Sequence, residues 1–162
     1  MTFQLKIRNK IVAGLIIISS TLLASNFIGR QMTYSLTPSL SHRLFILNRN
    51  VDLNKIKDGD IVRFPFSDSF TGGKVYLLKR VGCVPGELLT ADRDKNYFCG
   101  QRWLGHAKSM SSKGVPVASF KYTGEVPPGK FFAIADHKDS YDSRYIGFID
   151  ISSIEAKAYP VF

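Results

Sequence analysis

The sequence predicts a mostly β domain that follows a single N-terminal transmembrane helix. Two patterns lead to this class. Residues 11–28 form an apolar run without charge, whereas the later apolar runs are short and bounded by turn residues. No amphipathic segment of helical length appears after the apolar run. With 162 residues, of which 44% are hydrophobic, the chain is long enough for one domain with its own core.

The uncharged run of 18 residues at positions 11–28 has the length of a membrane span. As a helix it would extend about 27 Å, close to the roughly 30 Å of a hydrocarbon core. The positive-inside rule keeps its N-terminal end in the cytoplasm, because three basic residues precede it: Lys6, Arg8 and Lys10. We therefore expect a cytoplasmic basic tail at residues 1–10, an inner-membrane anchor at 11–28 and a periplasmic domain at 29–162.

Two other interpretations of this run are less favourable. A cleaved signal peptide would be cut near Ala24 or Ser25, but the position three residues earlier is then Leu22 or Leu23. Leucine is too large for a cleavage site of the A-x-A type. A buried core helix would show an amphipathic period, and none is visible.

The net charge of +9 raises the question of a nucleic-acid or anionic-membrane partner. Residues 1–50 hold six basic residues and no acidic one, and the rest of the chain holds 16 basic and 13 acidic residues. The excess therefore surrounds the apolar run, and no basic stripe with interleaved aromatics follows it. This distribution favours membrane lipid as a partner and argues against nucleic acid.

After the apolar run, short β-like segments alternate with turn residues such as those of VPGE and VPPGK. We expect strands at residues 43–47, 60–64, 74–81, 87–91, 96–104, 115–122 and 130–135. The tail, residues 145–162, is expected to hold two short strands around a turn or a single helical turn.

The two cysteines, Cys83 and Cys99, are 16 positions apart. In an oxidising compartment an even pair predicts one disulfide, which would stabilise the domain by roughly 3 kcal/mol. Two buried thiols are the alternative. We expect neither a metal nor another cofactor, because the histidines are scattered and complete no ligand set: His42, His106 and His137.

Lys79 occupies an unusual position in the expected strand 74–81. Strand alternation places it on the same face as three apolar residues, Val75, Leu77 and Val81. A lysine buried without a partner tends to lose its proton, and a neutral amine is a general base. The alternative, that the stem is buried and the ammonium reaches water, stays open on this pattern alone.

Hydroxyl residues are concentrated just after the expected anchor, within nine positions: Thr33, Ser35, Thr37, Ser39 and Ser41. Pro38 favours an extended or turn geometry next to Ser39. Ten residues reach at most about 33 Å, so a site built on Ser39 would lie near the membrane surface. A plain Ser/Thr-rich linker is the alternative.

A third segment groups three aspartates beside Arg144, namely Asp136, Asp139 and Asp142. The charges of such a loop either lie exposed to water or hold a functional site in place. An exposed Asp142–Arg144 pair would contribute only roughly 0–1 kcal/mol to the stability of the fold. Its spacing does not follow the calcium-loop pattern. The three segments together offer a nucleophile, a base and an orienting acidic loop without a histidine, which favours a Ser39–Lys79 dyad.

Four segments occur in this order along the chain: PSLSHRLF at 38–45, DGDIVRF at 58–64, KRVGCVPGE at 79–87 and DSRYIG at 142–147. They resemble the serine box, a G-D-[IV]-V strand, the lysine box and the D-S-R box of the signal peptidase I family. The resemblance implies a signal-peptidase-like β-rich domain and a serine endopeptidase that cleaves exported precursor proteins. The small size and single anchor are more similar to the TraF-type peptidases of conjugative transfer, whose substrate is the propilin.

The resemblance also implies roles for individual residues. Ser39 would attack the scissile carbonyl, and Lys79 would take its proton and later donate it to the leaving amine. Asp142 and Arg144 would brace the site, and Ser140 would hydrogen-bond the lysine amine. The oxyanion hole would use the Ser39 backbone N–H with a nearby hydroxyl or amide.

The nucleophile segment departs from the TraF-type pattern at two positions: Ser41, where that branch has proline, and Arg43, where it has glycine. Ser35 and Ser41 therefore remain fallback nucleophiles. The paired cysteines are also similar to this branch. The implied partners are propilin or another exported precursor, and mating-pair or type IV secretion components. The alternatives are a housekeeping signal peptidase I and a non-catalytic component of such an apparatus with the same fold.

Overall fold

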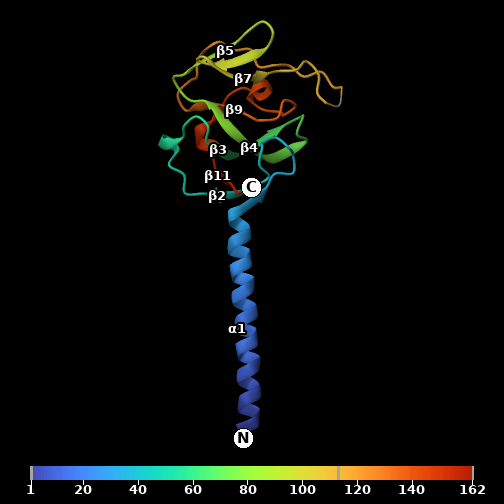
Figure 1. Ribbon diagram of the computed structural model, residues 1–162, viewed down its shortest axis with the longest axis vertical. Helices are drawn as coiled ribbons and strands as arrows, with labels where there is room; N and C mark the ends of the chain where they lie inside the picture. Colours follow the sequence, from blue (N-terminus) through green and yellow to red (C-terminus); the bar gives the residue numbers. More distant parts are fainter. Residues whose placement is uncertain (1, 113, 162) are drawn as a thin grey trace. The chain divides into compact units, whose positions relative to one another are not determined.

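The structure, a computed structural model, describes residues 2–112 and 114–161 and divides into two units, Met1–Thr33 and Tyr34–Phe162. The first unit is built on helix α1 (Thr2–Gln31), drawn in blue in Figure 1. The side chains of the predicted basic tail, residues 1–10, lie outside the described part of the chain. Among the residues that are described, no helix is both long and apolar enough to cross a membrane. Strand β1 (Met32–Tyr34) lies at the boundary between the units.

The second unit is mostly β, as predicted, and contains two antiparallel sheets. Within this unit the strands of the larger sheet have the order β2 (Leu44–Asn48), β11 (Ala156–Pro160), β3 (Ile61–Asp68), β4 (Gly73–Cys83), β9 (Lys130–Ile134) and β10 (Ile149–Asp150). The smaller sheet has the order β7 (Arg102–His106), β6 (Asn96–Cys99), β5 (Leu88–Ala91) and β8 (Gly124–Glu125). Its described residues also form three short helices: η1 (Leu53–Lys55), α2 (Ser143–Ile146) and η2 (Ile151–Ser153).

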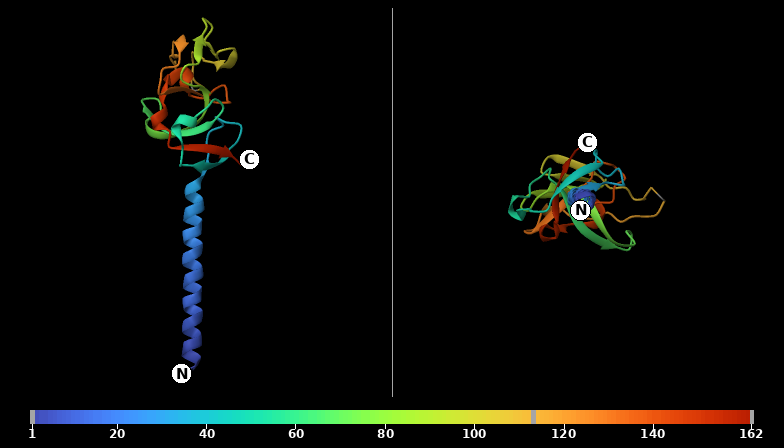
Figure 2. Two further views of the ribbon diagram at one scale, coloured as in Figure 1. Left: turned by 90° about the vertical axis from the view of Figure 1, so that its left-hand side faces the viewer. Right: turned by 90° about the horizontal axis from the view of Figure 1, so that it is seen from below.

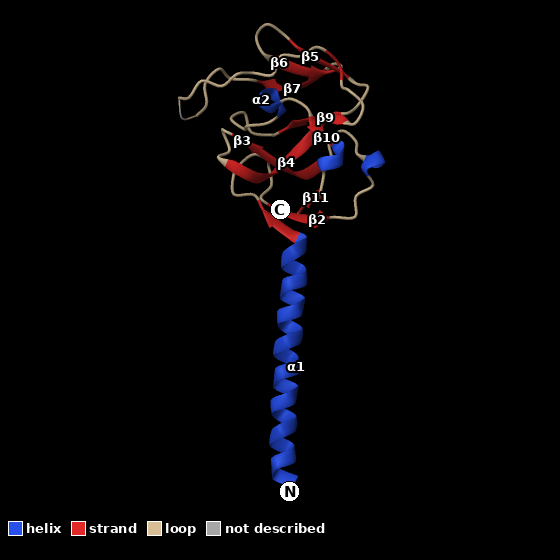
Figure 3. Cartoon of the chain, turned by 180° about the vertical axis from the view of Figure 1, so that it is seen from behind, coloured by secondary structure: helices blue, strands red, loops and turns tan. Residues whose placement is uncertain are grey.

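The smaller sheet lies at the end of the domain opposite β2 and β11 (Figure 1), and α2 lies beside β7 (Figure 3). The segment that follows β7 leaves the sheets and extends outward, as Figure 1 and the right-hand view of Figure 2 show. Much of the chain outside the two sheets is therefore loop, and the strands form the rigid scaffold that positions these loops.

Two of the expected strands differ from the structure. Residues 96–104 form not one strand but the hairpin β6–β7, because the chain turns at Gly100, whose φ is 56°. The strand expected at 115–122 is wrong. Pro116 forms an isolated bridge with Met110, and the backbone donors of this segment go to a loop and a helix, since Val117 N donates to Ser109 O and Phe120 N to Arg144 O of α2.

Strand β4 lies in the interior of the larger sheet, between β3 and β9. Its register pairs Lys79 with Val62 of β3 and the next residue, Arg80, with Ile134 of β9. Val81 and Lys79 are both buried, as alternation predicts for one face. The core beneath this face contains seven buried residues: Val62, Phe64, Val81, Phe131, Ala133, Ile149 and Ile154. The position of Lys79 is therefore set by a strand that is paired on both sides.

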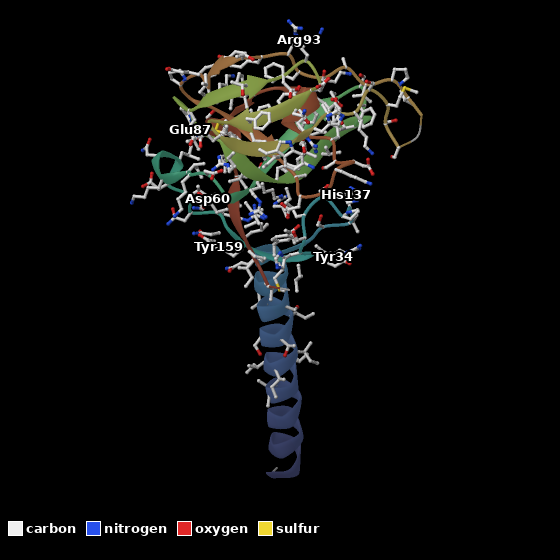
Figure 4. All side chains as sticks on the ribbon, turned by 45° about the horizontal axis from the view of Figure 1, so that its top comes forward. Tyr34, Asp60, Glu87, Arg93, His137 and Tyr159 are labelled. Carbon is white, nitrogen blue, oxygen red and sulfur yellow. A yellow bond between two sulfur atoms is a disulfide. The ribbon has the colours of Figure 1, made fainter. Side chains whose placement is uncertain are left out.

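A second buried cluster joins the two sheets and includes a disulfide between Cys83 and Cys99. Cys83 ends β4 and Cys99 ends β6, so the bond links one strand of each sheet. The same cluster contains six other buried residues: Leu89, Tyr97, Leu104, Ala107, Val126 and Phe132. Figure 4 shows Glu87 beside the yellow sulfur atoms.

The disulfide yields a stability prediction. Replacing both Cys83 and Cys99 with serine should lower the free energy of unfolding by about 3 kcal/mol, because the unfolded chain regains the entropy of an open loop. Urea denaturation of the detergent-solubilised chain measures this loss. Reductant should destabilise the wild type and leave the double variant unchanged. Equal midpoints for wild type and variant would show that the bond adds no stability.

Candidate active site

The backbone around Ser39 is held by the loop that follows β9. The carbonyl oxygen of Ser39 accepts hydrogen bonds from Asp136 N at 2.9 Å and from His137 N at 3.2 Å. Two residues further on, Ser41 donates from its N at 2.9 Å and its Oγ at 2.5 Å to Asp136 Oδ2. Leu40, between the two serines, is buried. The backbone of Ser39 and of the two residues that follow it is therefore held in place, which limits the directions that the Ser39 side chain can take.

Arg80 supports this arrangement, and sequence reasoning assigned it no role. Its guanidinium donates to both carboxylate oxygens of Asp136 at 3.1 to 3.2 Å and to Gly59 O at 3.2 Å. Burial acts to raise the pKa of Asp136, but the hydrogen bonds from Ser41 and the Arg80 charge outweigh it and lower that pKa. Strand alternation offered a signal, because a neighbour of Lys79 must point to the opposite face.

Three hydroxyls and the Lys79 amine form a continuous chain of contacts. Lys79 Nζ lies 2.6 Å from Ser140 Oγ, and Ser140 Oγ lies 3.2 Å from Ser39 Oγ. Thr37 Oγ1 lies 3.0 Å from Ser39 Oγ on the other side. The structure therefore brings together Ser39, Lys79 and Ser140 from segments that lie up to 101 positions apart.

The two fallback nucleophiles have different contacts. Ser41 donates its hydroxyl to Asp136, and Ser35 donates its hydroxyl to Thr37 O at 2.8 Å. Of the three candidate serines, Ser39 is the one whose described contacts lead to Lys79. This geometry favours Ser39 as the hydroxyl that a lysine base could activate.

Lys79 is buried rather than extended into water, with 3% of its surface exposed. Burial lowers the pKa of Lys79 to about 8, the negative charge of Asp142 acts against this, and the positive charge of Arg144 adds to it. An amine with such a pKa is neutral in about one molecule in ten at pH 7, and in more of them as the pH rises. It can therefore accept a proton, as a general base must.

Asp142 and Arg144 form a buried ion pair, in contrast to the exposed pair considered from sequence. The exposed fractions of their side chains are 0% and 2%, and Arg144 donates from Nε and Nη2 to the two carboxylate oxygens at 2.8 Å each. Asp142 also accepts from Ala135 N at 3.0 Å, and its side chain caps α2 by accepting from Arg144 N. The pair therefore closes the loop onto the end of β9.

Arg144 extends these contacts to the smaller sheet. Its Nη1 donates to His106 O at 2.8 Å, and its Nη2 lies 3.4 Å from Ser140 O. Gly105 makes this approach possible, because a Cβ there would lie 2.9 Å from Nη1 and its φ is 129°. The guanidinium thus connects the backbone of Ser140 to β7, a contact that no local pattern in the sequence indicates.

A cavity of about 450 Å³ lies over the hydroxyl chain. Its lining includes the proposed dyad, hydroxyl residues next to it and apolar side chains from the β3–β4 hairpin: Thr37, Pro38, Ser39, Phe70, Thr71, Leu77, Lys79, Ser112, His137, Asp139, Ser140 and Tyr141. This volume is within the range of about 300 to 1,000 Å³ that is usual for ligand sites. His137 is labelled in Figure 4.

One group of possible metal ligands occurs among the described residues, at Cys83, Glu87 and Cys99, whose ligand atoms lie within 4.8 Å of one another. Both sulfur atoms are bonded in the disulfide, which leaves one carboxylate as a ligand. The cluster is consequently a structural one.

The family profile described as signal peptidase, peptidase S26, matches residues 7–162. The chain belongs to this family. Signal peptidase I of Bacillus caldolyticus is 31% identical over 135 residues, which cover 76% of this chain and 71% of that protein. A crystal structure of a signal peptidase I from Enterococcus faecalis V583 matches at 25% identity with a TM-score of 0.42, covering 64% of this chain and 96% of that chain.

The S26 family consists of serine endopeptidases, and this chain is a serine endopeptidase of the signal peptidase I type. The resemblance stated from the sequence boxes is thereby confirmed at the level of the family. The TraF-type branch stays a prediction.

The buried ion pair yields a second prediction. Asp142→Ala should lower the free energy of unfolding by about 3 to 5 kcal/mol, because it leaves the buried Arg144 charge without its partner. Chemical denaturation measures the change. The matched control is Asp150→Ala, which breaks the exposed Lys130–Asp150 pair and should cost less than about 1 kcal/mol. Similar losses of unfolding free energy in both variants would show that burial does not make the Asp142–Arg144 pair more important for stability than an exposed pair.

Proposed function

We propose that Ser39 is the nucleophile and Lys79 the general base of this S26 peptidase. The contact chain from Ser39 Oγ through Ser140 Oγ to Lys79 Nζ carries the proposal. A nucleophile and its base must be within hydrogen-bond reach directly or through one intervening group. The lowered pKa of Lys79 supports the same assignment, because its amine needs to be neutral to act as a base.

The proton moves along this chain when Lys79 is neutral. Ser39 then donates to Ser140, and Ser140 donates to the lone pair of Lys79. As Ser39 Oγ forms its bond to the scissile carbonyl carbon, its proton passes to Ser140, whose own proton passes to Lys79. The resulting ammonium returns a proton to the leaving amine when the C–N bond breaks. A water molecule then hydrolyses the acyl-enzyme by the same route.

The developing oxyanion requires donors that are fixed before the reaction. The Thr37 hydroxyl, 3.0 Å from Ser39 Oγ, is the nearby hydroxyl that this role needs, together with the Ser39 backbone N–H. Asp142 and Arg144 act at a distance from the bond being cut. They hold the loop of Ser140, so their part is positioning.

We further propose that the peptidase is anchored in the inner membrane with its catalytic domain in the periplasm. The uncharged run 11–28 supports this, as do the exposed apolar side chains along α1, among them Leu15, Ile17 and Leu23. Signal peptidases act on exported precursor proteins. The small domain and the paired cysteines, Cys83 and Cys99, are similar to the TraF-type branch and favour the propilin of a conjugative apparatus as the substrate.

The decisive experiment follows processing in cells from which the gene for this protein has been deleted and which carry each variant in its place. Ser39→Ala and Lys79→Met should each accumulate uncut propilin and abolish pilus formation, because either change removes one member of the dyad. Immunoblots of propilin measure the outcome, and equal membrane levels of both variants are the control. Continued processing in both variants would refute the dyad. Normal propilin processing with lethal depletion of the peptidase would instead favour a housekeeping role.

The pKa of Lys79 predicts a pH dependence. The kcat/KM for a peptide substrate should rise about tenfold per pH unit below about pH 8 and level off above it, because only neutral Lys79 is a base. Stability should also rise between about pH 8 and the ordinary lysine pKa of 10.5, where the unfolded state binds the proton that the folded state has lost. Rate profiles and urea titrations measure both effects.

Lys79→Met is the control for the second effect. It should remove this contribution to the pH slope of stability, since no group at that position titrates. A rate limb centred near pH 10 in the wild type would mean that burial does not keep the amine neutral.

A further inference from the structure

A second cavity, of about 440 Å³, adjoins the cavity over the dyad. The two share five lining residues, Phe70, Ser112, Asp139, Ser140 and Tyr141. Neither Ser39 nor Lys79 lines the second cavity. It therefore begins at the Ser140 side of the hydroxyl chain and leads away from the nucleophile.

Six apolar or aromatic residues line this second cavity, beside four serines and two charged residues: Phe70, Met110, Val115, Val117, Tyr141 and Tyr145. Its two charged lining residues, Lys108 and Asp139, form an ion pair with each other. A charged ligand would have to compete with that pair, whereas an apolar side chain would bury surface against the aromatic wall. The cavity therefore fits an apolar or aromatic side chain.

The aromatic wall is held in place by hydrogen bonds at its edges. Tyr141 stacks on Phe70 with ring centroids 4.4 Å apart, and its hydroxyl donates to Asp68 at 2.8 Å. The Tyr145 hydroxyl accepts from Lys108 N at 2.9 Å. These contacts tie the β3–β4 hairpin and the segment after β7 to the loop of Ser140. A ligand would meet a preformed surface, which reduces the entropy lost on binding.

We infer that this second cavity binds an apolar side chain of the substrate segment that leaves after cleavage. The inference rests on the proposed function. Lys79 must protonate the leaving amine, so that amine has to approach the Lys79–Ser140 end of the contact chain. The chain that follows the amine then passes Ser140 and enters the cavity that begins there. Specificity would thus extend beyond the residues that precede the cut.

Two quenched peptides test this, both with Ala-Leu-Ala before the cut and with three Phe or three Asp residues after it. The wild type, in detergent, should show a kcat/KM at least about tenfold higher for the Phe peptide. Met110→Asp combined with Val115→Asp should bring the ratio to about one. The matched control is Leu88→Asp in β5, because all three side chains are 50% exposed, and it should keep the wild-type ratio. Equal rates for the two peptides in the wild type, or an unchanged ratio in the double variant, would overturn the inference.

A binding measurement separates this inference from the proposed dyad. A fluorescent peptide that begins with Phe-Phe-Phe should bind Ser39→Ala, and adding the Met110→Asp and Val115→Asp changes should weaken binding at least about tenfold. Fluorescence anisotropy measures both. Binding without any cleavage by the wild type would refute the dyad and support the cavity. Cleavage that depends on Ser39, without binding of this peptide, would support the dyad and refute the role of the cavity.

Discussion

Lys79 keeps its amine in a buried position where the Ser140 hydroxyl, at 2.6 Å, is its described hydrogen-bond partner. The rest of the site depends on this contact. Burial disfavours the charged amine and so lowers its pKa, but a buried amine also needs a polar neighbour. A hydroxyl can be that neighbour in both protonation states of the lysine, because it accepts a hydrogen bond from an ammonium and donates one to a neutral amine. A carboxylate in its place would hold the proton on the lysine.

The loop after β9, together with helix α2 that follows it (residues 135–147), positions most of the groups that surround this contact. Asp136 N binds the backbone of Ser39, Ser140 joins the two proposed catalytic side chains, and Asp142 with Arg144 fixes the loop to β9 and β7. The loop is therefore a rigid part of the site, although it is rich in charge. Its charged groups are largely paired or hydrogen-bonded within the protein, which explains why they do not all extend into water.

Burying Lys79 and the Asp142–Arg144 pair removes three ionisable groups from water, and this opposes folding. The packed cores of the two sheets and the disulfide between them stabilise the folded state and offset this cost. The disulfide closes one end of β4, the strand that carries Lys79, and so restrains the site as well as the domain. The strand that carries the desolvated lysine is paired on both sides, which fixes its backbone in the sheet.

The sequence by itself determined the β class of the domain, the strand with Lys79 among apolar neighbours, and the order of the boxes that indicate the family. These features depend on alternation and short motifs, which are local along the chain. Only the tertiary structure decided that Ser140 contacts Ser39 as well as Lys79, that Arg80 binds Asp136, and that residues 115–122 form no strand. Each of these depends on contacts between distant segments, up to 101 positions apart, and no local pattern encodes such distances.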